Sequence, residues 1–194
     1  MKIIAITGSI GTGKTTLAGM VKKLGYGVYD ADAQVRKIYR QKNFLALIKK
    51  VFPFSFENGV FNKRVLRDEV FKDKKKLEEL ESLIHPFIKQ NLHRFIRKYS
   101  KNTDLWFMDM ALLYELGWDK FCHFIILTDV DYDIQKRRVM NRDNISEADF
   151  ERIVSVQMNN EQKKILSDVV IDTNKSKNIL LAELIGIIET IKND

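Results

Sequence analysis

Short apolar runs alternate with segments of helical spacing along most of this chain. The run Ile3–Ile6 reads as a buried strand, and the segment Thr15–Lys23 after it places Leu17, Met20 and Val21 on one helix face. Further strands are expected at residues 26–30, 105–109, 121–127 and 169–172, and further helices at 112–116, 131–141, 145–164 and 178–192. This alternation predicts an α/β fold with a parallel sheet of about five strands flanked by helices.

The segment from about 33 to 101 interrupts the alternation. It has helical spacing, few strand signals and many Lys, Arg and Glu residues. Helices are expected in FLALIKKVF, in RVLRDEVF and in a long stretch bent or broken near Pro86, with an Asn58-Gly59 turn between the first two. Because this block is too large for a crossover between parallel strands, it predicts an inserted helical subdomain.

The junction between the first strand and the first helix reads GSIGTGKT. Glycines let such a turn curl until its backbone N–H groups converge, an arrangement that favours an anion. The junction fits G-x-x-x-x-G-K-[ST], whereas the dinucleotide pattern G-x-G-x-x-G fails at Thr16. It therefore predicts a nucleoside triphosphate with Mg²⁺ on Thr15, the triphosphate contacting Gly8, Ser9, Ile10, Gly11, Thr12, Gly13, Lys14, Thr15 and Thr16.

Acidic residues follow two of the expected strands. Asp30 and Asp32 end the strand at 26–30, and in an extended chain both would point the same way. Either could take a proton from an acceptor hydroxyl or position Mg²⁺, and the alternative is that Asp32 only caps the next helix. Asp109 ends the strand at 105–109 and is either a Mg²⁺-holding acid or an ordinary strand-end residue.

Two arginines lie four residues apart in QKRRVMNRD. This spacing puts Arg138 and Arg142 on one face of the expected helix. Arginines carried by a closing lid can stabilise the negative charge that phosphoryl transfer spreads over the γ-phosphate oxygens. The alternative is a solvated basic helix face.

Taken together, these motifs resemble the dephospho-CoA kinase family. The matching segments span Ile3 to about Asp172 and are, in chain order, GSIGTGKTT, VYDADAQVR, LIHP, DMALLYE, R-x-x-x-R-D and DVVID. The resemblance implies ATP- and Mg²⁺-dependent phosphorylation of the ribose 3′-hydroxyl of dephospho-CoA, the last step of coenzyme A synthesis. It also implies site residues: Asp32 as general base, Lys14 and Arg138 as further catalytic residues, Arg142 on ATP, Asp109 on Mg²⁺, and Arg36, Arg64, Arg67 and His85 at the acceptor. For His85, a purely structural role is the alternative.

The resemblance further implies a division of the chain into functional parts. The nucleotide-binding core would be residues 1–32, 103–136 and 165–194, the acceptor-binding insert 33–102 and the lid 137–164. Glu115 would be structural, paired with a base. The chain departs from the family pattern at three places: Ala111 stands where Pro is usual, Asn160 where some members have Arg, and Thr173-Asn174-Lys175 where Asn and Gly commonly border the adenine.

The formal net charge of +7 fits polyanionic substrates but also fits nucleic acid or an anionic membrane. No RNA- or DNA-reading motif is found, and no apolar run approaches the roughly 18 residues that a bilayer requires. The single cysteine allows no internal disulfide, and the start of the chain lacks the features of a signal peptide. We therefore expect a cytoplasmic protein with no nucleic-acid or membrane partner, either a monomer or a weak homo-oligomer. Two alternatives are another P-loop nucleotide or nucleoside kinase and a nucleic-acid-binding protein that uses ATP as a switch.

Overall fold

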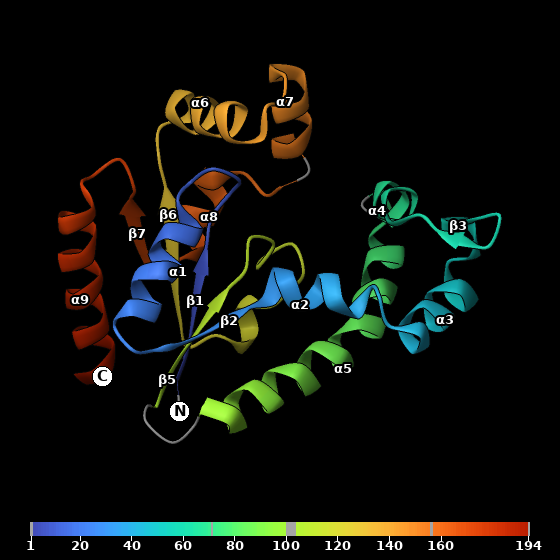
Figure 1. The fold of residues 1–194 in the computed structure, drawn as a ribbon, viewed down its shortest axis with the longest axis horizontal. Helices are drawn as coiled ribbons and strands as arrows, with labels where there is room; N and C mark the ends of the chain where they lie inside the picture. Colours follow the sequence, from blue (N-terminus) through green and yellow to red (C-terminus); the bar gives the residue numbers. More distant parts are fainter. Residues whose placement is uncertain (1, 71, 100–103, 156, 194) are drawn as a thin grey trace. The chain divides into compact units, whose positions relative to one another are not determined.

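The computed structural model describes residues 2–70, 72–99, 104–155 and 157–193. The chain forms two compact units, Met1–Asp30 with Tyr99–Asp194 (unit 1) and Ala31–Lys98 (unit 2), whose elements are drawn in Figure 1. The predicted boundary at 102–103 and the last residue of the expected helix at 64–71 lie outside the described residues.

Unit 1 is built on a five-stranded sheet in the order β2-β5-β1-β6-β7, with every neighbouring pair parallel. The expected α/β architecture with a parallel sheet is therefore confirmed. The strands are β1 (Lys2–Thr7), β2 (Gly27–Asp30), β5 (Leu105–Asp109), β6 (Phe124–Asp129) and β7 (Val169–Asp172). The helices are α1 (Lys14–Lys23), η2 (Asp119–Phe121), α6 (Tyr132–Asp143), α7 (Glu147–Ser155), α8 (Asn160–Leu166) and α9 (Lys177–Asn193).

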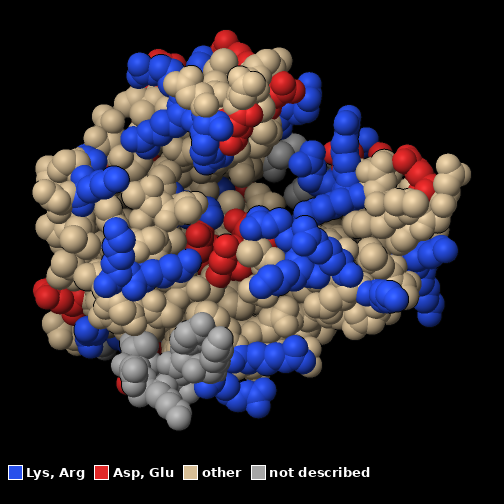
Figure 2. Space-filling view, viewed as in Figure 1, with Lys and Arg blue, Asp and Glu red and all other residues tan. Residues whose placement is uncertain are grey.

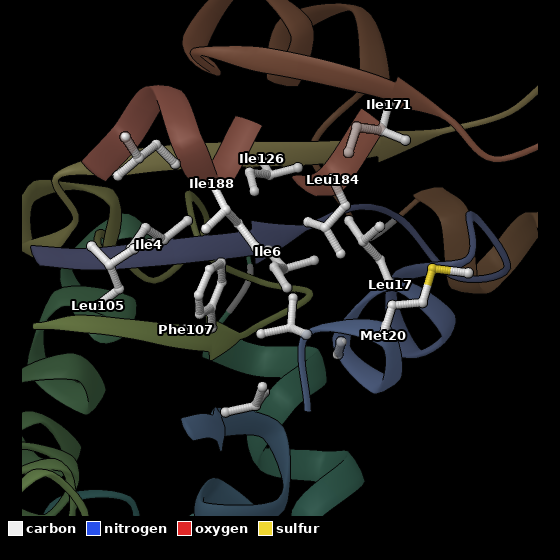
Figure 3. Close-up of a cluster of buried hydrophobic side chains, with 14 of the residues drawn as sticks. Ile4, Ile6, Leu17, Met20, Leu105, Phe107, Ile126, Ile171, Leu184 and Ile188 are labelled. Atoms are coloured by element: carbon white, nitrogen blue, oxygen red, sulfur yellow. The ribbon is translucent and has the colours of Figure 1, made fainter. Parts of the chain in front are cut away.

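The main core lies between the sheet and two helices, α1 and α9. Its side chains come from all five strands of the sheet and from one face of each helix, as Figure 3 shows for Ile6, Phe107, Ile126, Leu17 and Leu184. The central strand β1 is buried along both faces from Ile3 to Thr7. This explains why its sequence is continuously apolar and not alternating.

Unit 2 is mainly helical. Its elements are α2 (Ala31–Ile38), α3 (Lys42–Val51), η1 (Pro53–Ser55), β3 (Phe56–Glu57), β4 (Val60–Phe61), α4 (Lys63–Val70) and α5 (Lys74–Tyr99). The Asn58-Gly59 turn is confirmed, because it joins the antiparallel strands β3 and β4 with φ angles of 50° and 80°. These two-residue strands were not expected from the sequence.

Of the bend or break expected near Pro86, the break is wrong, because α5 continues through this residue. Proline removes the amide that would bond to the carbonyl four residues earlier. The apolar stripe of the helix is nevertheless continuous across it, with Ile84, Ile88 and Leu92 buried. Packing of this stripe outweighs the lost hydrogen bond.

Two further expectations about local structure are corrected. β2 ends at Asp30 and α2 begins at Ala31, so Asp32 lies in the first turn of a helix and does not share an extended chain with Asp30. Residues 111–117 form turns and not a helix. Their backbone bonds mix three spacings, from Leu116 to Leu112, Gly117 to Tyr114 and Trp118 to Leu113, which no regular helix can satisfy. Among the described residues, no helix has the length and apolarity needed to cross a membrane.

Replacing Ile126 by alanine should destabilise the protein strongly. Ile126 is 0% exposed in the core, so Ile126→Ala leaves a cavity that costs about 2–5 kcal/mol of unfolding free energy. The matched control is Ile179→Ala at a side chain that is 54% exposed, where the change should stay within about 0.5 kcal/mol. Urea unfolding of both variants measures the difference, and equal losses would contradict this position of the core.

Candidate active site

The GSIGTGKT segment forms a tight loop between β1 and α1. Gly13 is the N-cap of α1 with φ 90°, and its carbonyl accepts the amides of Thr16 and Leu17. The loop therefore leads directly to the amino end of a helix, where unpaired N–H groups and the helix dipole favour an anion.

Two glycines let the loop approach its neighbours closely. A Cβ on Gly8 (φ 151°) would lie 2.3 Å from the Thr128 hydroxyl oxygen on β6. A Cβ on Gly11 (φ 79°) would lie 2.4 Å from a methyl carbon of Val139 on α6. These contacts and φ angles exclude a side chain at either position.

The tip of the loop is held by side chains from distant segments. The Ile10 amide donates to Gln157 Oε1 at 3.0 Å, and Gln135 Nε2 donates to the Ile10 carbonyl at 2.7 Å. The Ser9 hydroxyl donates to Asn160 Oδ1 at 2.5 Å, and Thr173 Oγ1 donates to the Thr12 carbonyl at 2.8 Å. Polar side chains of the segments after β6 and β7 thus fix the shape of the loop.

A cation and two carboxylates meet at the carboxyl end of the sheet. Lys14 Nζ pairs with Asp109 Oδ1, and both side chains are nearly buried. Asp30 stands in register with Asp109 on the neighbouring strand, so the two residues lie side by side. This places acidic groups next to the phosphate loop, as expected for Asp109.

The donor set around Lys14 suits Mg²⁺ bound together with a phosphate group. Thr15 is exposed at the second position of α1 and offers a hydroxyl, while Asp109 offers a carboxylate. Within the described residues, no group of three or more His, Cys, Asp or Glu side chains could hold a metal alone. Mg²⁺ usually binds one or two protein oxygens and completes its shell with phosphates and water, so these residues fit it.

Arg138 and Arg142, both on α6, have different surroundings. Arg138 donates to the hydroxyl and the carbonyl of Thr173 at 3.0 and 3.1 Å. Arg142 pairs with Asp143 at 2.6 Å and is 59% exposed. Arg138 is thus held beside the end of the phosphate loop through Thr173, whereas Arg142 faces solvent.

In unit 2, several charged groups gather at the start of α4. Lys63 Nζ lies 4.9 Å from the centre of the Tyr39 ring. Loss of water around its amine, together with the nearby charges of Arg36 and Arg67, lowers the pKa of Lys63, and Asp32 offsets part of this effect. Three cations around one carboxylate leave an excess of positive charge that suits a phosphate-bearing ligand.

Sequence reasoning had pointed to Arg64 and His85 but had missed Lys63. The Arg64 side chain is 84% exposed and pairs with Asp68 at 3.6 Å, and His85 is half-buried within α5. The sequence signal that could have located Lys63 was Asn62. Its side chain accepts hydrogen bonds from the amides of residues 64 and 65, and this cap makes α4 begin at Lys63.

The sheet order and the loop ahead of α1 together define a P-loop NTPase-type fold. A solved structure from Thermus thermophilus is similar over 97% of this chain and 96% of its own, with a TM-score of 0.84 and 28% identity. A shikimate kinase from Acinetobacter baumannii shares only the fold, with a TM-score of 0.54 and 14% identity over 100% of this chain and 94% of its own.

Sequence comparison identifies the family within this class. The model of the dephospho-CoA kinase family matches residues 2–178. The dephospho-CoA kinase of Bartonella henselae is 35% identical over 192 residues, which cover 98% of both chains. That of Fusobacterium nucleatum is 34% identical over 192 residues, which cover 97% of this chain and 98% of the relative. The chain belongs to the dephospho-CoA kinase family, as the sequence motifs indicated.

Gly11→Ala should impair nucleotide binding because the new Cβ would meet Val139 and Gln135 and displace the loop. We expect the dissociation constant for Mg-ATP, measured by calorimetry, to rise by at least about tenfold, equivalent to about 1.4 kcal/mol. Gly19→Ala is the matched control: Gly19 lies in α1, an added Cβ there would have no neighbour within 4 Å, and the affinity of this variant should not change. Equal affinities for the two variants would show that the loop tolerates a side chain.

Proposed function

We propose that the protein transfers the γ-phosphoryl group of ATP to the ribose 3′-hydroxyl of dephospho-CoA, giving coenzyme A. The observation that carries this proposal is the family match over residues 2–178, which includes unit 2 as well as the phosphate loop. The direct test is incubation with Mg-ATP and dephospho-CoA and detection of coenzyme A by mass spectrometry. Absence of product from folded protein would overturn the proposal.

In unit 1, the phosphate loop would bind the triphosphate. The backbone N–H groups of residues 8–16 would surround the β- and γ-phosphates, and Lys14 would turn from Asp109 toward them. Mg²⁺ held by Thr15 and Asp109 would neutralise phosphate charge. Arg138 would stabilise the charge that develops on the γ-phosphate, and Arg142 would contact ATP as the lid at 137–164 closes.

In unit 2, the charged cluster at α4 would hold the acceptor. Arg36, Lys63 and Arg67 would attract the phosphates of dephospho-CoA, and Arg64 and His85 remain predicted contacts. Asp32 would accept the proton of the 3′-hydroxyl as it attacks phosphorus. Figure 2 shows Lys and Arg side chains gathered over this unit, which agrees with a polyanionic ligand.

The same proposal assigns roles to the parts of the chain. Unit 1 would be the nucleotide-binding core with its lid, and unit 2 the acceptor-binding insert. A cytoplasmic location and a monomeric or weakly associating state stay predictions. Assays with a panel of nucleosides and nucleotides as acceptors would reveal another kinase activity, and nucleic-acid binding that persists at high salt would favour the ATP-switched alternative.

Asp32→Asn should separate catalysis from nucleotide binding. Loss of the general base should lower kcat by about 10²-fold or more, while the dissociation constant of Mg-ATP stays unchanged. Asp30→Asn provides the comparison, because Asp30 lies on β2 two residues earlier. If kcat fell in Asp30→Asn and stayed at the wild-type value in Asp32→Asn, Asp30 would be the base.

Binding of dephospho-CoA should weaken as the pH rises, at pH values below those at which ordinary lysines lose their charge. Because the pKa of Lys63 is lowered, its charge is lost as the pH rises toward the usual lysine range, and the KM for dephospho-CoA should then increase. Lys63→Arg keeps its charge and should flatten this alkaline rise. The control is Lys74→Arg, at a side chain that is 89% exposed, which should keep the wild-type profile. Identical profiles for all three proteins would exclude Lys63 from the acceptor site.

A further inference from the structure

An ion pair lies buried in unit 1, and neither of its residues belongs to the phosphate loop. Lys163 of α8 is 0% exposed, and its Nζ lies 3.0 Å from Oε1 of Glu115, which is 9% exposed. A fully buried lysine is rare in proteins. A buried pair also carries a desolvation cost that apolar side chains of similar volume avoid, so stability alone is a weak reason for it.

Each partner also binds the backbone of a different segment. Lys163 Nζ donates to the Ala111 carbonyl at 3.1 Å, two residues beyond Asp109. Glu115 Oε1 accepts the Met158 amide at 2.7 Å. The pair therefore connects the turn that follows β5 with the segment that leads into α8.

These two segments carry the groups that surround the phosphate loop. Met158 follows Gln157 directly and is two residues before Asn160, the side chains that hold Ile10 and Ser9 at the loop tip. Ala111 lies beyond Asp109, which pairs with Lys14 at the other end of the loop. Through the ion pair, these contacts connect the tip of the phosphate loop to the carboxylate of Asp109.

We propose that Glu115 and Lys163 are positioning residues that fix the distance between the tip of the phosphate loop and Asp109. They act through Met158 and Ala111 and touch neither nucleotide nor metal. The directional contacts require one donor and one acceptor at a set separation, which an apolar pair cannot supply. This inference rests on the proposed function, because it takes the γ-phosphate and Mg²⁺ to lie between the two parts that the pair holds apart.

The test compares binding of Mg-ATP and Mg-ADP by calorimetry in three variants. Glu115→Gln/Lys163→Met removes both charges and keeps an acceptor for the Met158 amide, so its thermal midpoint should stay near that of the wild type. Glu115→Asp keeps both charges but shortens the reach of the carboxylate. In both, the preference for ATP over ADP should fall, by at least about tenfold in the double variant, with a fall in kcat of about 10²-fold.

The control is Lys136→Met, which breaks an ion pair between α6 and α7 (2.8 Å from Glu147) without touching the path to the loop. Its ATP preference and kcat should match the wild type. If the two Glu115 variants kept the ATP preference and the kcat of the wild type, the pair would have only a structural role and the inference would be overturned. If wild-type protein forms no coenzyme A, the proposed function fails, whereas the ATP-to-ADP preference still decides the role of the pair.

Discussion

The backbone of Ile10 is the point on which the phosphate site depends. Its amide and its carbonyl are both bonded to glutamine side chains, Gln157 and Gln135, that lie more than a hundred residues away in the chain. Each bond contributes only about 0.5–1.5 kcal/mol by itself. Together they hold a glycine-rich turn, which has high conformational entropy when free, in a single curled form. A loop fixed in advance loses less entropy when it binds a ligand.

Much of this architecture could be predicted because it arises from local pattern. The apolar run of β1 and the G-x-x-x-x-G-K-T junction specify a buried strand, a curled loop and a helix start within a few residues of sequence. Asp109 was found in the same way, as an acid at the end of a buried strand. Family motifs then identified the class of reaction before any contact was known.

What could not be predicted depends on tertiary contacts. Because α2 begins directly after β2, Asp32 lies on a helix and not in the extended chain that the sequence predicted. Lys63 was missed because only the fold brings it to Tyr39 and to the charges of Arg36 and Arg67. The partner of Glu115 was expected only as some base, since no spacing in the sequence relates it to Lys163. Charged side chains whose partners lie far away in the chain carry no periodic signal that reveals them, whereas apolar faces do.

The close approach of Gly11 to Val139 also limits how the chain can change over generations. Because a Cβ on Gly11 would stand 2.4 Å from the Val139 methyl, the two positions share one small volume. A bulkier side chain at 139 would press on the loop even with Gly11 intact, and a smaller one would leave a void beside it. Change on the buried face of α6 is therefore restrained by the glycine turn, and descendants of this sequence should keep glycine at 11 and a side chain of similar size at 139.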